Sequence, residues 1–162
     1  MFAEKQDRLY DVEGDMMMQT QLTDIDKVTD AQIAFICARL HLRGGKQRLQ
    51  EGYSAAGIAA LYDAVLFGMR YYIVIHAGCT AFVKNMDIWD ASGLFDALVQ
   101  AGVFDDRLIF NRFSLIVERV LWQPSFSFDT ASTLAEVETM LKKLGVMPFD
   151  ESPLPGKLLI VH

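Results

Sequence analysis

The residues best suited to metal chemistry are two Cys–His pairs, each spaced to lie on one face of a helix. Cys37 and His41 are four residues apart. His76 and Cys79 are three apart, so the four side chains have the composition of a Cys2His2 zinc site. If the two helices meet at a turn near residue 52, the pairs differ in height by roughly 18 Å, because a helix rises 1.5 Å per residue. We therefore predict no metal site and no cofactor, and interpret both cysteines as buried, reduced thiols.

A second chemical group is the run of cations in RLHLRGGKQR. A continuous helix would place the first three on one face, since they recur at intervals of four and three residues. The members are Arg39, Arg43, Lys46 and Arg48. Guanidinium groups bind phosphate and carboxylate through paired hydrogen bonds, and the adjacent glycines permit a close backbone approach. The spacing does not match a P-loop. The run is either an anion-binding or RNA-contacting stripe or a solvated helix face that can pair with the acidic arm, and the solvated face is favoured.

Asp63 and Arg70 form a third candidate, a buried polar pair. They are seven residues apart in an apolar helical pattern, so they lie on the same side of the helix, two turns apart. Buried charges usually have partners, so each is expected to meet a charge from another helix, such as Arg112, Glu118 or Arg119. The alternative is a polar functional pocket.

Motifs for covalent catalysis are absent. The sequence has no G-x-S-x-G elbow, and both cysteines lie in apolar helical patterns that disfavour a thiolate. The carboxylate pairs Asp105-Asp106 and Asp150-Glu151 occupy expected helix ends or loops, where capping explains them. We assign no catalytic residue from these patterns.

The elements that position these residues are helical. The spacing predicts a helix from Asp30 that either ends at Arg43 or continues through Gly44-Gly45 to Glu51 and stops at Gly52, and the good helix formers after the glycines favour continuation. The next helix is apolar almost all round, from Ile58 to Ile73, and should be central. Its first half is rich in alanine and glycine. We therefore expect the two helices to pack closely as a long antiparallel hairpin.

Three shorter helices should complete the domain. The first follows Asp87 and runs to about Ala101, the second runs from Asp105 or Asp106 to Pro124, and the third spans about Thr130 to Leu144. Two of these end in Leu-x-x-x-Gly-Val, at Gly102 and Gly145, as in a Schellman stop.

The prediction is therefore an all-α bundle of about five helices around the hairpin. Its parts are an irregular acidic arm at 1–29, the helical domain at 30–147, and an extended Pro-containing tail with an apolar end at 148–162, where Leu158 to Val161 lack an obvious partner.

Charge and hydropathy exclude several functions. Of the net charge of −6, residues 1–30 carry −5, so the rest is nearly neutral and presents no broad basic face for duplex DNA. The longest strongly apolar uncharged run, from Tyr71 to Val83, has 13 residues, short of a membrane span. The first residues lack the apolar core of a signal peptide. We predict a cytoplasmic protein that does not bind membranes.

Two short segments resemble known families. GKQRLQEGYSAAGIAALYDA is similar to one tetratricopeptide unit, with Gly45, Gly52-Tyr53 and Ala64 near that family's glycine, turn and alanine positions. The resemblance implies a tight helical hairpin. Arg70 and His76 form R-x5-H, which resembles the active motif of HEPN-type helical bundles. That resemblance implies RNA cleavage by this pair across a dimer interface.

Two functional hypotheses follow. The leading one is a non-enzymatic interaction or regulatory domain that self-associates or binds a protein partner, because chemical motifs are absent while Trp89, Trp122 and the apolar ends are candidates for contact with partners. The alternative is an HEPN-like enzyme, directed at RNA or a nucleotide, that uses Arg70 and His76 together with the cations between Arg39 and Arg48.

Overall fold

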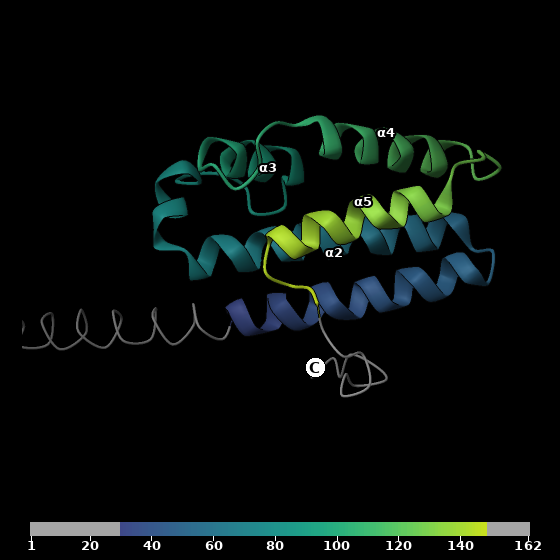
Figure 1. Ribbon diagram of the computed structural model, residues 1–162, viewed down its shortest axis with the longest axis horizontal. Coiled ribbons are helices and arrows are strands. Elements are labelled where there is room, and N and C mark those ends of the chain that lie inside the picture. The colour runs from purple at the N-terminus through teal and green to yellow at the C-terminus, as the bar shows by residue number, and fades with distance from the viewer. Residues whose placement is uncertain (1–29, 149–162) are drawn as a thin grey trace, which may run out of the picture. The chain divides into compact units, whose positions relative to one another are not determined.

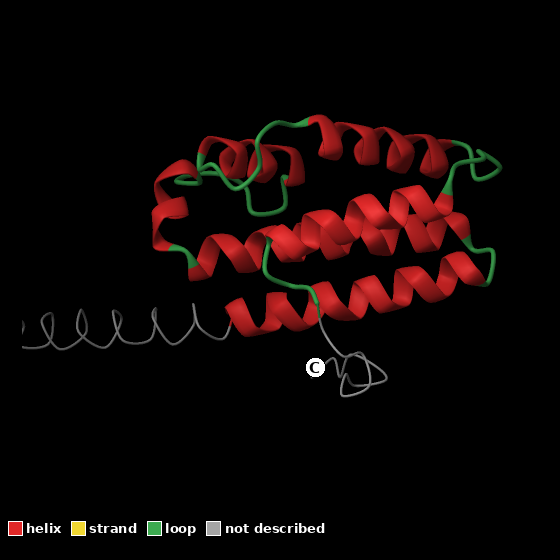
Figure 2. Cartoon of the chain, viewed as in Figure 1, coloured by secondary structure: helices red, strands yellow, loops and turns green. Residues whose placement is uncertain are grey.

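The computed structural model describes residues 30–148 of the chain, and these residues form only helices and loops (Figures 1 and 2). The all-α class is therefore confirmed for this part of the chain. From Ala31 onward the described residues belong to one compact unit. The predicted arm at 1–29 and nearly all of the predicted tail lie outside the described residues. In chain order the elements are a helix over residues 30–50, α2 (Ser54–Ile75), the 3-10 helix η1 (Ala77–Phe82), α3 (Ala91–Gln100), α4 (Leu108–Trp122) and α5 (Thr130–Lys143).

The helix over residues 30–50 continues through both glycines, as the pattern predicts, and it approaches α2 closely. A Cβ atom added at Gly45 would lie 2.7 Å from Leu61 Cδ2, and one added at Gly57 would lie 2.8 Å from Leu49 Cδ2. Only hydrogen fits at these two positions, so the backbones lie nearer than side chains would allow. Gly52, with φ +87°, makes the turn that follows the first helix.

Helix α2 occupies the centre of the described domain. It contacts η1, α3, α4 and α5, and ten of its 22 residues are buried. Its length and composition would also suffice to cross a membrane, but half of its most apolar stretch is buried inside the domain. Such burial is the property of a core helix that is apolar almost all round.

Helix α5 and the residues after it close over α2. Gly68 of α2 has no room for a side chain, because an added Cβ would lie 2.9 Å from Leu141 Cδ2 and 3.3 Å from Leu144 Cδ1. The side chains of Leu141, Leu144 and Val146 are fully buried. Small residues on α2 therefore allow close packing against α5 as well as against the first helix.

The start of α3 corrects one expectation. The helix begins at Ala91, three residues later than a cap at Asp87 would place it. Asp90 is the N-cap, and its Oδ1 accepts from the Gly93 backbone N–H at 3.1 Å. Asp87 instead accepts from the Trp89 backbone N–H at 2.9 Å in the preceding turn. Both aspartates accept a hydrogen bond from a nearby backbone N–H. The sequence therefore does not show which of them begins the helix and which caps the preceding turn.

The two Leu-x-x-x-Gly-Val ends have the predicted geometry. Gly102 and Gly145 have φ of +79° and +77°. The Val103 N–H donates to the Leu98 carbonyl at 2.9 Å, and the Val146 N–H donates to the Leu141 carbonyl at the same distance. These are the long hydrogen bonds of Schellman stops, and they end α3 and α5.

An aromatic cluster joins α3 to α4. The Phe95 ring lies 4.4 Å from that of Phe104 and 4.7 Å from that of Phe110, measured between centroids. Phe113 is fully buried and stacks on Tyr62 of α2 at 6.3 Å. These rings fix the position of α4 against α2 and α3.

Candidate functional site

The described residues form a groove of about 800 Å³ between α2 and α4. Its walls come mainly from these two helices, with contributions from Ser92 and Arg107. The lining residues are Ala59, Tyr62, Asp63, Ser92, Arg107, Phe110, Asn111, Ser114, Leu115, Val117, Glu118 and Leu121. Leucine, valine, alanine and aromatic rings make up about half of this set, so the groove can hold an apolar segment.

Polar groups from both walls lie in this groove. Asp63 comes from α2 and Glu118 from α4, and neither forms a salt bridge with another described residue. The Ser114 Oγ atom is buried and has no hydrogen-bond partner among the described residues. An unpaired buried hydroxyl costs about 1–3 kcal/mol, so a ligand that supplied its partner would recover part of this cost.

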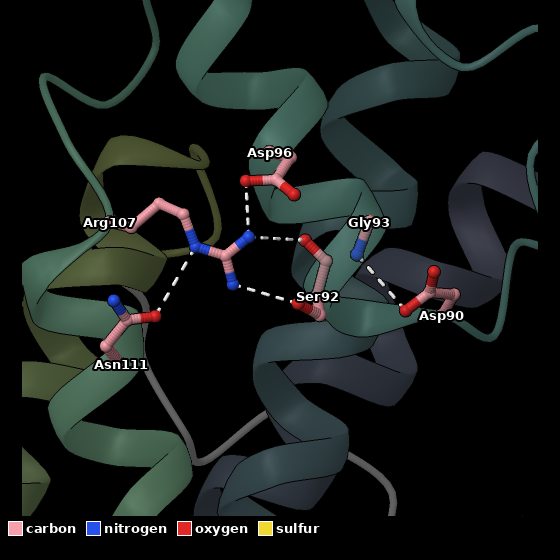
Figure 3. Close-up of polar contacts among 6 residues, drawn as sticks. All are labelled: Asp90, Ser92, Gly93, Asp96, Arg107 and Asn111. Carbon is pink, nitrogen blue, oxygen red and sulfur yellow. Dashed lines mark hydrogen bonds and ion pairs between the residues drawn. The ribbon is translucent and has the colours of Figure 1, made fainter.

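Arg107 closes one end of the groove and is already engaged by neighbouring polar groups (Figure 3). It forms a salt bridge with Asp96, and its Nη2 donates to Ser92 Oγ at 2.8 Å. Its Nε donates to Asn111 Oδ1 at 3.4 Å. Through these contacts, the Arg107 guanidinium holds α3 against the start of α4. The net charge offered by the groove therefore comes from Asp63 and Glu118.

Tyr62 adds a hydrogen-bond donor to the groove. Burial raises the pKa of its phenol, and the negative charges of Asp90 and Asp63 raise it further. Tyr62 consequently stays protonated at neutral pH and cannot serve as a phenolate base. With apolar walls, two carboxylates and a neutral phenol, the groove suits an apolar ligand that carries a donor or a cation.

The two residues of the R-x5-H resemblance engage different neighbours. The Arg70 guanidinium carbon lies 4.4 Å from the Trp89 ring centroid and 5.2 Å from that of Phe67. His76 is exposed and stacks on Tyr72 at 3.8 Å, with its Nδ1 2.9 Å from the Tyr72 carbonyl oxygen. Neither side chain lines the groove.

Asp63 and Arg70 do not form the predicted buried pair. Both are only half-buried, and no salt bridge joins them within the described residues. Asp63 lines the groove, while Arg70 lies over the Trp89 ring. The suggested partner Arg112 instead binds Glu136 of α5, with 2.7 Å between Nε and Oε1.

Two members of the basic run hold the first helix against α5 and the segment after it. Arg39 Nε donates to the Val146 carbonyl at 3.1 Å, and its guanidinium carbon lies 3.9 Å from the Phe35 ring centroid. Lys46 Nζ lies 2.9 Å from Glu138 Oε1. Arg43 is half-buried and Arg48 is exposed. The run therefore contributes tertiary contacts, a role that spacing within one helix could not reveal.

The four candidate metal ligands also have separate surroundings. Cys37 and Cys79 are buried free thiols, and burial raises the pKa of both. The His41 ring stacks on Phe67 at 5.5 Å, whereas His76 stacks on Tyr72. Over residues 30–148, no group of three or more Cys, His, Asp or Glu side chains could hold a metal ion.

His41 should make the stability of the domain depend on pH. Burial lowers its pKa below the ordinary 6.5, Asp63 opposes this shift and Arg48 adds to it. The folded chain thus binds a proton at this site less readily than the unfolded chain does. The contribution of the neutral His41 ring to the free energy of unfolding is complete above pH 6.5, and it is lost as the pH falls through the lowered pKa of this histidine.

The test is denaturant unfolding at about pH 7.5 and about pH 5.5. We expect His41→Gln to lose less stability than the wild type between these two conditions. The control His76→Gln replaces an exposed histidine and should keep the wild-type dependence. Equal pH dependence in all three proteins would contradict the assignment.

The outer side of α4 presents a line of large apolar side chains next to the groove. Leu108, Leu115 and Trp122 follow one another at intervals of seven residues, and we call them the α4 stripe. Their exposed fractions are 61%, 49% and 84%. The seven-residue interval can be read from the sequence. Which face of α4 is exposed cannot, because that depends on the side that α2 covers.

Comparison of the chain with family models, curated proteins and solved structures finds no match. The groove and the α4 stripe lie on adjoining sides of one helix and share Leu115.

Proposed function

We propose that this protein is a small cytosolic, non-enzymatic interaction domain that binds a protein through the outer side of α4. In this proposal the domain is a five-helix bundle built around the long antiparallel hairpin of residues 30–50 and α2. The single observation that carries the proposal is the α4 stripe. Burying a leucine or a larger apolar side chain stabilises a complex by about 1.5–3 kcal/mol, so three aligned residues are a strong binding determinant.

The groove supports the same function. It widens the apolar area beside the stripe through Leu121 and Val117, and it adds carboxylates at its rim. Aromatic and leucine side chains surrounded by polar groups are typical of protein interfaces. An enzyme that uses Arg70 and His76 has less support, since each of these side chains packs on a different ring.

The test compares the native size of the protein in extracts of its own cells. We expect wild-type chain to elute well above its monomer mass of 18.2 kDa, and the double variant Leu115→Ser, Trp122→Ser to elute as a monomer. The matched control is Tyr53→Ser, Ile88→Ser, which replaces two side chains that are 64% and 50% exposed elsewhere. Circular dichroism would verify that each variant is folded.

The control should elute like the wild type. A wild-type protein that stays monomeric both in these extracts and as purified protein at high concentration would overturn the proposal. So would an assembly whose size does not change when the α4 stripe is made polar.

A further inference from the structure

We infer that the partner of the α4 stripe is a second copy of this chain, with the two α4 helices side by side and running in the same direction. This inference rests on the proposed function and names its partner. Two features identify this partner: the charged residues on the two flanks of the stripe, and the seven-residue interval between the stripe residues.

The stripe faces directly away from the domain core. At about 100° per residue, Leu108, Leu115 and Trp122 lie within about 40° of one another around the helix axis. Phe113 and Val120 lie on the opposite side and are fully buried. Figure 1 shows α4 along one edge of the domain, with α2 and α5 on one side of it only. Within residues 30–148, the outer side is exposed from Leu108 to Trp122.

The flanks of the stripe differ in charge. Asn111 and Glu118 lie on one flank, and Arg112 and Arg119 lie on the other, all four being exposed. Polar and acidic groups thus border one edge of the apolar line, while basic groups border the other edge.

This asymmetry selects the parallel orientation. A two-fold axis along two parallel helices brings opposite flanks together, so Glu118 faces Arg119 of the second copy. A two-fold axis across antiparallel helices brings like flanks together, so Arg112 would face Arg119 of the second copy. Like charges that face each other across an interface are unfavourable. Arg112 also binds Glu136, which weakens its repulsion of Arg119 in the antiparallel pair, so the parallel orientation is favoured mainly by its two Glu118–Arg119 pairs.

The apolar layers fit the same orientation. A seven-residue repeat places equivalent residues opposite each other in a parallel pair, so each stripe residue meets its own counterpart. Helix α4 has 15 residues, about 22 Å, and supplies three such layers. An interface of this length falls at the small end of specific interfaces, so we expect a dimer that forms and dissociates with concentration.

Cysteine cross-linking on the full-length protein tests the orientation. We expect Leu108→Cys alone and Trp122→Cys alone each to form a disulfide-linked dimer under mild oxidation. Leu115→Cys should cross-link in either orientation and serves as the positive control. The wild-type chain, whose two cysteines are buried, and Tyr53→Cys should remain monomeric on a denaturing gel.

Two outcomes would overturn the inference. Cross-linking that requires a mixture of the Leu108→Cys and Trp122→Cys chains would show antiparallel helices. Absence of cross-linking in Leu115→Cys would show that the stripe does not bind a second copy. In the latter case, a large assembly in cell extracts would leave the proposed function intact with a different partner, and a monomer both there and as purified protein at high concentration would overturn both.

A charge exchange tests the flank pairing independently. By sedimentation velocity over about 1–300 µM, we expect Glu118→Arg and Arg119→Glu each to weaken dimerisation roughly 3- to 30-fold. The double variant Glu118→Arg, Arg119→Glu restores opposite charges and should return the dissociation constant to near the wild-type value. Unchanged dimerisation in the single variants, or no recovery in the double variant, would contradict the pairing.

Discussion

Replacing Phe95 by alanine is expected to lower the free energy of unfolding by about 3–5 kcal/mol. Phe95 is fully buried, and its ring lies within 5 Å of those of Phe104 and Phe110, measured between centroids. Removing it leaves a cavity where the loop before α4 and α4 itself pack on α3. A domain of ordinary stability has about 5–15 kcal/mol in total, so the variant should be largely destabilised at moderate denaturant concentration. Urea unfolding followed by circular dichroism measures the effect.

The matched control is the same kind of truncation at the surface. Trp122→Ala removes a larger ring, but one that is 84% exposed, so its unfolding free energy should stay within about 0.5 kcal/mol of the wild-type value. The same variant should nevertheless lose self-association. Similar destabilisation by both variants, measured at a concentration where the wild type is monomeric, would show that the position assigned to α4 is wrong.

The two neighbouring glycines of the first helix should respond to alanine with opposite signs. Gly45→Ala would place a methyl group 2.7 Å from Leu61 Cδ2 and 3.1 Å from the Gly57 carbonyl oxygen, both in a buried contact. Overpacking of this kind costs about 1–3 kcal/mol, and the backbone carbonyl has no room to move. We expect this cost to exceed the roughly 1 kcal/mol that alanine gains over glycine in a helix.

Gly44→Ala provides the control within the same turn. There the added methyl group would lie 3.5 Å from the Arg48 side chain, an ordinary contact, so alanine should stabilise the domain by up to about 1 kcal/mol. Chemical denaturation of the two variants and the wild type gives the comparison. A stabilising Gly45→Ala would mean that the first helix and α2 are farther apart than described.

The elements that could be predicted from sequence are those specified by local patterns. The apolar residues of α2 repeat over more than four turns and include many small side chains, so a central, closely packed helix followed directly. Gly102 and Gly145 each stand four residues after a leucine and directly before a valine, and both take the left-handed conformation that such stops require. Each of these signals lies within a single helix or helix end, so it does not depend on the rest of the chain.

Where local signals compete, prediction was less accurate. Asp87 and Asp90 are both suitable caps, and the choice of Asp90 places the start of α3 at Ala91. The 3-10 helix η1 after α2 was not anticipated, because the apolar pattern of α2 continues into it. Packing against α2 and α3 accompanies the change of helix type there.

The candidate site was the least predictable part, because its residues come from separate elements. Asp63 was expected to meet a charge, yet it borders a groove opposite Glu118 and Ser114, about 50 residues away in sequence. The cations Arg39 and Lys46 were assigned to an external ligand or to solvent. Their observed partners, Val146 and Glu138, lie near the end of the described chain. Spacing along one helix cannot identify partners that only tertiary packing brings together.

The hydrogen bond from Arg39 to Val146 also bears on how the domain is completed during synthesis. It joins residues that are 107 positions apart, near the two ends of the described region. At ribosomal rates of about 5–20 residues per second, the first helix waits on the order of ten seconds for this acceptor. Until then its apolar side has α2 as a neighbour but lacks α5 and Val146. The nascent chain should therefore become protease-resistant only after residue 146 has left the exit tunnel.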